Sequence, residues 1–321
     1  MSKRARCRVL TLDGGGINGA FTAGVLAQFE ETLGRRVVDH FDLIVGTSTG
    51  GILAIGLGMG IPAKEIEKMY CERGREIFGA DGYLERSTAV LRHFFRPKHQ
   101  QENLRKVLLD VLGERKLGDS LVRLVIPTFD SSKGTACTFK TAHHERLRYE
   151  YDKPAVDIAI ATASAPTYFS AASIRDRQGI DYIDGGVWAN DPVLVGIVEA
   201  VHFLGRPLSE IDVLSVGTTN ELIYFSQNRH AGLFGWSKYL INVLMAGQAT
   251  AAQAQARLLV GDRLQRINLP VPEKIPMDRA SNAQSLAGRG RSVARAEGQL
   301  KVARERFLNG IHVEPFVSIY R

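Results

Sequence analysis

The segment LIVGTSTGG, residues 43–51, places Ser48 at the centre of a Gly-x-Ser-x-Gly pattern directly after an apolar run. This pattern is typical of a nucleophile elbow, a tight strand-to-helix turn that exposes a serine Oγ at the top of a sheet. The flanking glycines are needed because side chains there would collide with the neighbouring strand and helix. The spacing predicts an acyl-transfer nucleophile at Ser48; a glycine-rich loop that merely contains a serine is the alternative.

A second glycine-rich segment, DGGGINGAF at residues 13–21, precedes a predicted helix. Acyl transfer needs N–H donors for the oxyanion of the tetrahedral intermediate. Three successive glycines leave their backbone amides free to point at one oxygen. We therefore expect an oxyanion hole formed by the amides of Gly14, Gly15 and Gly16.

The same loop allows a competing interpretation. Residues 14–19 match the G-x-G-x-x-G pattern of dinucleotide-binding loops. Asp13 disfavours this interpretation because its carboxylate would repel a pyrophosphate, and no Gly-Lys-Ser/Thr follows to make a P-loop. A nucleotide-binding module that uses the Gly14–Gly19 loop, with Ser48 incidental, stays open as an alternative function.

Ser48 needs a group that accepts its proton, and Asp184 is the best-placed candidate. The segment YIDGG, residues 182–186, repeats the arrangement of an apolar strand, a functional side chain and two glycines that permit a sharp turn. A carboxylate there could accept the serine proton directly, which would make a Ser–Asp dyad. Aspartate is a weak base at its ordinary pKa, so the site would have to be dry enough to raise that pKa.

A Ser-Asp-His triad in a soluble carboxylesterase is the alternative. The downstream histidines are His202, His230 and His312, and none of them follows a buried strand in a glycine turn. We interpret each as an ordinary, partly exposed histidine. His312 remains the candidate base if the dyad is wrong.

Repeated strand-then-helix units surround these motifs and predict a parallel sheet covered on both faces. No linker or repeat interrupts the chain, so we expect a single domain over residues 1–321. Residues 8–218 would form the catalytic core and residues 219–321 a helical C-terminal elaboration. The segment IHVEPFVSIY, residues 311–320, is predicted to be a final strand.

Composition limits the class of protein. The chain has 321 residues, a net charge of +7 and a sequence pI near 9.4, which favours contact with anionic surfaces. Three cysteines without paired spacing predict neither a disulfide framework nor a zinc site, and the basic start lacks a signal-peptide apolar region. These features predict a cytoplasmic protein. The uncharged residues 43–63 contain six glycines and Pro62, which favours a buried strand, turn and helix over a membrane span.

DGGGINGAF, GTSTGG and DGGVWANDP, in this order, resemble the three signature blocks of the patatin-like phospholipases, and ATASAPTYF at residues 161–169 also fits. The resemblance covers about residues 8–218. It implies an α/β fold of the patatin-like three-layer α/β/α type, with a mainly parallel central sheet and a helical C-terminal elaboration. It also implies Ser48 as nucleophile, Asp184 as its partner and the Gly14–Gly16 amides as oxyanion hole, with no metal or other cofactor.

The resemblance further implies membrane phospholipids as the substrate and no nucleic acid polymer as a partner. We expect a cytoplasmic enzyme that acts peripherally at the inner face of the membrane, with GLFGWSKYLINVL, residues 232–244, as the candidate contact segment. Compact bacterial members resemble the phospholipase effectors of cyclic-oligonucleotide anti-phage signalling, and this chain is similar to them in its length, cytosolic character and helical C-terminal third. A cyclic oligonucleotide activator is therefore expected outside the Ser48 pocket. Homo-oligomerisation stays open.

Two further features bear on these expectations. The activator would be held by arginines of the C-terminal third, at positions 289, 291, 295, 304 and 306. The chain also departs from the family pattern, with Asn18 where Arg or Lys is frequent and Asn190-Asp191-Pro192 where Asn-Asn-Pro is frequent. These departures leave the headgroup preference open.

Overall fold

The computed structural model describes residues 6–78, 101–174, 177, 179–221, 240–271, 275–314 and 316–320. Within these ranges an eight-stranded sheet has the strand order β5-β6-β3-β2-β1-β7-β9, with β4 paired to β3. A two-stranded sheet pairs β8 with β10. The strands are β1 Cys7–Leu12, β2 Leu43–Gly46, β3 Arg123–Asp130, β4 Thr135–Lys140, β5 Ala172–Ser173, β6 Asp181–Asp184, β7 Ile211–Val216, β8 Asn220–Glu221, β9 Leu264–Ile267 and β10 Pro270–Val271.

The centre of the main sheet is parallel and one of its sides is antiparallel. The strands β3, β2, β1, β7 and β9 pair in parallel, in that order. The pairs β3–β4, β3–β6 and β5–β6 are antiparallel. β4 follows β3 after residues 131–134, a connection too short for a parallel crossover. The predicted mainly parallel sheet is confirmed, with an antiparallel side that the strand–helix repeats did not indicate.

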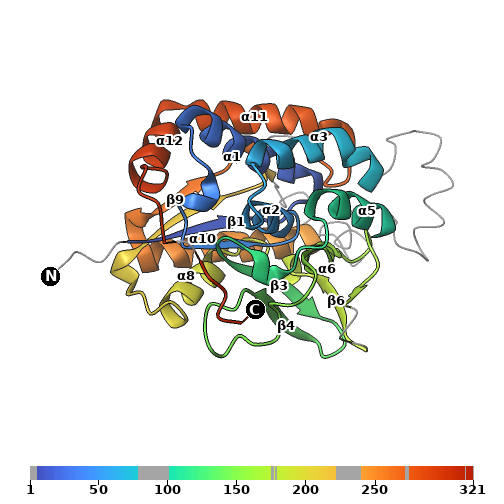
Figure 1. The fold of residues 1–321 in the computed structure, drawn as a ribbon. Helices are drawn as coiled ribbons and strands as arrows, with labels where there is room; N and C mark the ends of the chain where they lie inside the picture. Colours follow the sequence, from blue (N-terminus) through green and yellow to red (C-terminus); the bar gives the residue numbers. More distant parts are fainter. Residues whose placement is uncertain are drawn as a thin grey trace, which may run out of the picture.

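Helices cover both faces of the main sheet (Figure 1). Successive side chains of β1 point to opposite faces: Leu10 and Leu12 enter one apolar cluster, whereas Cys7 and Val9 enter another. The first cluster includes side chains of α1 Gly19–Leu33, α2 Thr49–Gly58, α3 Ala63–Phe78, α5 Gln101–Leu112, α6 Ala155–Ala163 and α11 Ala283–Arg295. The second includes side chains of α8 Val193–His202 and α10 Leu240–Val260. The expected three-layer α/β/α arrangement is confirmed.

The C-terminal part packs on the first helix of the chain. Figure 1 shows α11 alongside α1, and a Cβ atom at Gly290 would collide with the carbonyl of Phe21. Beyond α11, the chain continues through α12 Glu297–Val302 and a π-helical turn, Ala303–Phe307. This confirms the expected helical C-terminal region.

The final strand expected over residues 311–320 is wrong for the residues described there. Val313 N donates to Asp39 O at 3.0 Å and Ile319 N donates to Ala142 O at 2.9 Å. These bonds reach two different segments, so they do not form the ladder along one partner that defines a strand. Within the described ranges, no helix has the length and apolar character needed to cross a membrane.

Candidate active site

Ser48 lies in the turn between β2 and α2. Its backbone has φ 55° and ψ −122°, a conformation that is strained for a residue with a side chain. A Cβ atom at Gly46 would collide with Gly50 O, and one at Gly50 would collide with Leu12 O. The two glycines therefore allow the close approach that this turn requires. The expected elbow geometry is observed, with Ser48 buried at the start of α2.

Two threonines hold the elbow in place. Ser48 N donates to Thr162 Oγ1 at 3.0 Å, and Thr162 Oγ1 donates to Pro127 O at 2.6 Å. On the other side, Thr47 Oγ1 donates to Ala189 O at 2.6 Å. The sequence analysis assigned no role to Thr162. The available signals were its position as a polar residue in the largely apolar helix α6 and its place in the segment ATASAPTYF.

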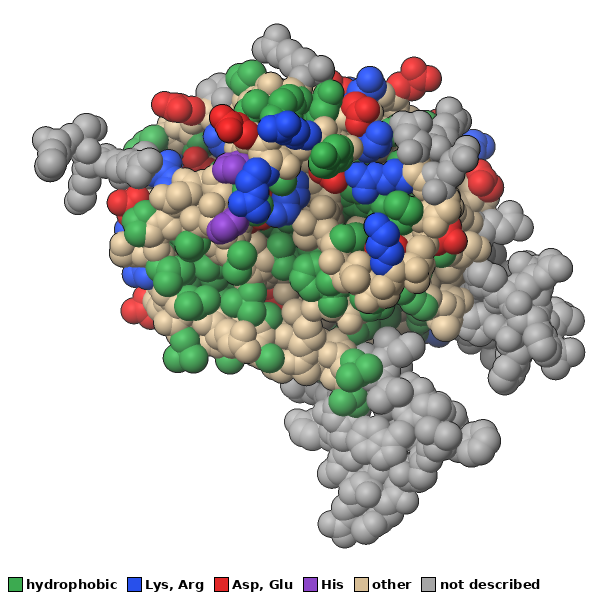
Figure 2. Space-filling view, turned by 90° about the horizontal axis from the view of Figure 1, so that it is seen from below, with side chains coloured by type: hydrophobic (Ala, Val, Ile, Leu, Met, Phe, Trp, Pro, Cys, Tyr) green, Lys and Arg blue, Asp and Glu red, His purple; other side chains and the backbone are tan. Residues whose placement is uncertain are grey.

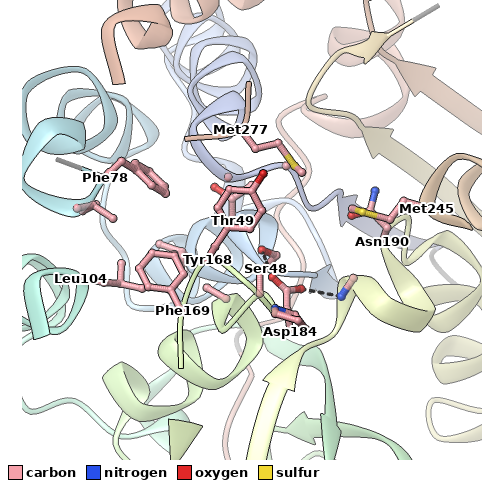
Figure 3. A pocket seen from close by; sticks show the side chains of 18 of the residues that line it. Ser48, Thr49, Phe78, Leu104, Tyr168, Phe169, Asp184, Asn190, Met245 and Met277 are labelled. Atoms are coloured by element: carbon pink, nitrogen blue, oxygen red, sulfur yellow. Dashed lines mark hydrogen bonds between the residues drawn. The ribbon is translucent and has the colours of Figure 1, made fainter. Parts of the chain in front are cut away.

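Asp184 is the last residue of β6 and lies directly opposite Ser48 (Figure 3). Ser48 Oγ donates to Asp184 Oδ2 at 2.6 Å, and Gly186 N donates to Asp184 Oδ1 at 2.7 Å. Burial raises the pKa of Asp184 to about 6, although both hydrogen bonds oppose the rise. The geometry therefore brings a buried serine into contact with a carboxylate that is a stronger base than an exposed aspartate.

No histidine is placed to act on Ser48 among the described residues that line this pocket. His312 is exposed, and its ring lies 4.8 Å from the ring of His40. His40 comes just before β2, so both histidines lie near the amino end of this strand, whereas Ser48 follows its carboxyl end. His202 ends α8 and packs on Phe203. His230 lies outside the described residues. The alternative triad through His312 is therefore wrong on this geometry.

The glycine loop borders the same pocket, but its three amides are not equivalent. Gly14 N already donates to Asn190 O at 2.9 Å, so it is not free for an oxyanion. Gly15 and Gly16 line the pocket beside Ser48, and no acceptor for their amides is found among the described residues. The expected hole is therefore corrected to Gly15 and Gly16, and their role stays a prediction.

A buried ion-pair network joins this loop to the C-terminal part. The Arg266 guanidinium on β9 donates to both carboxylate oxygens of Asp13, and Arg266 Nη1 lies 3.4 Å from Asp191 Oδ2. Gln253 of α10 also donates to Asp191 Oδ2 at 2.6 Å. Burial raises the pKa of Asp13, while the charge of Arg266 opposes the rise. Asp191, the departure from Asn-Asn-Pro, thus faces a cation that a sequence motif alone does not reveal.

The pocket in front of Ser48 is a cavity of about 350 Å³ with mainly apolar walls. Figure 3 shows aromatic side chains on one side of Ser48 and Asn190 with Met245 on the other. Asn190 Oδ1 is buried with no hydrogen-bond partner in the described part of the chain. The apolar walls include Ile52, Met69, Ile77, Phe78, Leu104, Tyr168, Phe169, Leu244, Met245 and Met277.

The C-terminal arginines expected to hold an activator occupy different environments. Arg291 donates to the carboxylates of Glu31 and Glu67, and Arg295 Nε donates to Gln28 Oε1 at 2.9 Å. These contacts fasten α11 to α1 and α3. Arg306 instead lines a second cavity. The remaining two, Arg289 and Arg304, are exposed.

Comparison with known proteins decides the family. The model of the family described as patatin-like phospholipase matches residues 10–197, more than half of the chain. The chain belongs to the patatin-like phospholipases. It is therefore a lipid acyl hydrolase by family, with the fold that the sequence predicted.

The relatives are similar over most of their length. The chain is 34% identical to a cGAMP-activated phospholipase of Pseudomonas aeruginosa, covering 87% of this chain and 81% of the relative. It is 33% identical to a cGAMP-activated phospholipase of Vibrio cholerae, covering 90% and 91% of the two chains. Among solved structures, VipD from Legionella pneumophila superposes with a TM-score of 0.43 at 12% identity, covering 89% of this chain and 67% of VipD.

Proposed function

We propose that the protein hydrolyses ester-linked fatty acids of membrane phospholipids through an acyl-Ser48 intermediate. The observation that supports this most directly is the 2.6 Å hydrogen bond from Ser48 Oγ to Asp184 Oδ2 beside an apolar pocket. A carboxylate in contact with a serine on a strained elbow matches the requirement for an activated nucleophile. The apolar walls suit a fatty acyl chain, which makes a lipid ester the best-matched substrate.

The proposed reaction has two steps that use the same carboxylate. In the first, Ser48 Oγ attacks the ester carbonyl carbon while Asp184 takes the serine proton. The tetrahedral intermediate collapses, the bond to the glycerol oxygen breaks, and Asp184 returns the proton to that oxygen. In the second step, Asp184 removes a proton from water, and the water oxygen attacks the acyl carbon. When the bond from the acyl carbon to Ser48 Oγ breaks, Asp184 returns the proton to Ser48 Oγ, and the fatty acid is released.

The negative charge of each tetrahedral intermediate lies on the former carbonyl oxygen. We assign its stabilisation to the amides of Gly15 and Gly16, two residues that line the pocket together with Ser48. The amino terminus of α2, which begins at Thr49, adds a favourable dipole close to the same position. Asn190, whose Oδ1 has no hydrogen-bond partner among the described residues, is placed to contact the substrate at the opposite wall.

The substrate ester lies at a membrane surface, so the enzyme must bind that surface peripherally, which we assign to the inner face of the membrane. Two side chains at the pocket are exposed and apolar: Leu244 is 63% exposed and Val187 is 50% exposed. Figure 2, which views the molecule of Figure 1 from below, shows further hydrophobic side chains gathered on this face. Val198 and Val201 of α8 are also exposed. Exposed apolar side chains of this kind favour contact with lipid.

The membrane-contact segment proposed from the sequence, residues 232–244, lies largely outside the described residues. Its aromatic side chains include Phe234 and Trp236. In the double variant Phe234→Ser/Trp236→Ser, we expect hydrolysis of vesicle lipid to fall much more than hydrolysis of a short-chain soluble ester. Equal loss on both substrates together with a lower Tm would instead identify the segment as core.

We further propose that a cyclic oligonucleotide activates the enzyme in anti-phage defence. The support is the 31–34% identity to relatives that are named cGAMP-activated phospholipases. The activator would bind outside the Ser48 pocket, because that pocket is apolar.

The experiment that tests the proposed function measures fatty-acid release from phospholipid vesicles by the purified protein, with and without a panel of cyclic oligonucleotides. We expect release that increases in the presence of one member of the panel. Absence of release under every condition, from a folded protein that also leaves soluble esters intact, would contradict the hydrolase assignment. Full release without any nucleotide would contradict activation alone.

A further inference from the structure

A second cavity, of about 850 Å³, lies at the end of the main sheet opposite to Ser48. Its walls come from the starts of β1 and β7, from the residues before β9 and from the segment 302–311. Because β1, β2, β7 and β9 are parallel, these walls lie at the amino ends of the strands, whereas Ser48 and the glycine loop follow the carboxyl ends. In Figure 1 this is the side of α12 and the N-terminus. We name it the arginine cavity after Arg6, Arg8, Arg263 and Arg306.

The four arginines differ in how far the protein itself satisfies them. Arg6 forms a two-point ion pair with the carboxylate of Asp212. Arg8 Nη1 donates to two backbone carbonyls, Phe307 O at 3.1 Å and Ile311 O at 2.9 Å. These two side chains therefore have structural partners.

Arg263 and Arg306 are different, because neither forms an ion pair with a carboxylate in the described part of the chain. Arg263 Nε is buried and has no hydrogen-bond partner there. Arg306 Nη1 donates to Asp262 O at 2.6 Å, a backbone carbonyl, although the carboxylate of Glu305 lines the same cavity. Buried donors without partners are rare in folded proteins, so this wall is suited to an anionic ligand with several acceptor oxygens.

The cavity also contains a carboxylate with hydrogen-bonding capacity left. Glu210 Oε2 is buried and forms a long ion pair of 3.9 Å with Arg206 Nη1, but it accepts no hydrogen bond from the residues that the structure describes. A carboxylate accepts hydrogen bonds from N–H groups, such as those on the edge of a guanine base, and it repels a free phosphate. Arginine donors next to a carboxylate therefore fit a nucleotide better than they fit inorganic phosphate.

We propose that the arginine cavity binds the cyclic dinucleotide that activates the enzyme. Arg263 and Arg306 bind the phosphodiester groups, and Glu210 accepts hydrogen bonds from a base. This inference rests on the proposed activation by a cyclic oligonucleotide. It places the ligand at Arg263 and Arg306 rather than at the α11 arginine Arg291, which is already paired with two glutamates.

Three strands connect the arginine cavity to the glycine loop. β1 leads to Asp13, and its six residues span about 20 Å. β7 leads to Thr218, whose Oγ1 donates to Gly14 O at 2.8 Å. β9 begins directly after Arg263 and contains Arg266, the partner of Asp13. The ligand would activate the enzyme if it binds Arg263 more tightly in the conformation that has the glycine loop correctly placed. Binding then increases the population of that conformation.

The test measures binding of cGAMP by calorimetry and fatty-acid release from vesicles in parallel. Wild type is compared with Arg263→Gln, Arg306→Gln and the double variant. Arg289→Gln is the matched control, because Arg289 is an exposed arginine of α11 outside the cavity. Each cavity substitution should weaken cGAMP binding by about 10- to 100-fold, and the control should stay within about twofold of wild type. An unchanged Tm shows that each variant is folded.

The possible outcomes separate the two proposals. Binding and activation that are unchanged in the folded double variant would overturn the site and leave nucleotide activation intact. A wild type that neither binds nor responds to cGAMP or other cyclic dinucleotides would overturn both. If the double variant does not fold, Arg263→Lys and Arg306→Lys keep the charge without the two-point geometry, and each should weaken binding by about tenfold. Wild-type affinity in both lysine variants would then overturn the site.

Discussion

At the carboxyl ends of the parallel strands, Ser48, Asp184 and Gly186 form a continuous chain of hydrogen bonds. At the amino ends, in contrast, Arg263 Nε and Glu210 Oε2 are buried without a hydrogen-bond partner in the described structure. A catalytic group must be held in its working geometry before the substrate arrives, since ordering it later would raise the barrier. A binding site can leave donors unpaired because the ligand satisfies them.

The same contrast separates two kinds of arginine. Arg266 is enclosed between Asp13 and Asp191 and fixes the glycine loop next to Ser48. Arg306 has only a backbone carbonyl as its partner among the described residues. We therefore expect substitutions at the catalytic end to change the chemical step. Substitutions at the opposite end should change its dependence on the activator.

The largest effect is expected for Ser48→Ala. Loss of Oγ removes the nucleophile and should lower fatty-acid release by about 10⁴-fold or more, with little change in Tm because only one buried oxygen is lost. Ser120→Ala is the matched control, since Ser120 is also buried but its Oγ donates only to Val122 O. Substantial release by folded Ser48→Ala enzyme would falsify the nucleophile assignment.

Asp184→Asn should be nearly as damaging, by roughly 10³- to 10⁴-fold in kcat, because an amide cannot accept the serine proton. Asp157→Asn is the control: Asp157 is equally buried, on α6, and pairs with Arg105 rather than with the site. Single-turnover kinetics with a soluble ester measure the effect. Near wild-type acylation by Asp184→Asn would mean that another group is the base.

The pH profile sharpens the same assignment. Asp184 must be ionised to accept a proton, and burial raises its pKa to about 6. The plot of log kcat/KM for a soluble ester should therefore be flat above this pH and fall by about one unit per pH unit well below it. A value of kcat/KM that stays constant down to about pH 4 and falls only below it would indicate a carboxylate with the ordinary pKa of an exposed aspartate. That result would contradict the buried position of Asp184.

A smaller effect is expected for Arg266→Gln. Removal of this charge leaves Asp13 and Asp191 without their cation, which displaces the glycine loop and should lower kcat about 10- to 100-fold with little change in KM. The matched control is Lys140→Gln, because Lys140 pairs with buried Glu199 at similar burial but on β4, away from the pocket. If both variants lose the same stability and kcat of Arg266→Gln is unchanged, the ion-pair network has only a structural role.

Much of the catalytic end could be predicted from the sequence because glycine spacing there reports a specific backbone requirement. Gly46 and Gly50 are needed where chains come too close for a Cβ atom, and this requirement locates Ser48. In the same way, two glycines after β6 locate Asp184. The strand–helix alternation likewise predicted the parallel centre of the sheet.

The remaining features depend on contacts between residues far apart in the chain. Arg266 meets Asp13 across 253 positions, and the hydrogen bond from Gly14 N to Asn190 O spans 176. No local pattern reports such pairs, so the sequence analysis included Gly14 in the oxyanion hole and overlooked Arg266. It also gave Arg291 and Arg306 the same role, although only Arg306 lines the cavity.

The most direct test of the central claim, that Asp184 activates Ser48 for acyl transfer, is covalent labelling by a fluorophosphonate followed by peptide mass spectrometry. The account predicts a single adduct on the peptide containing Ser48. Its rate should fall at least about 10³-fold in Asp184→Asn and remain unchanged in Asp157→Asn. An adduct on a different residue, or equal labelling rates in wild type and Asp184→Asn, would contradict it.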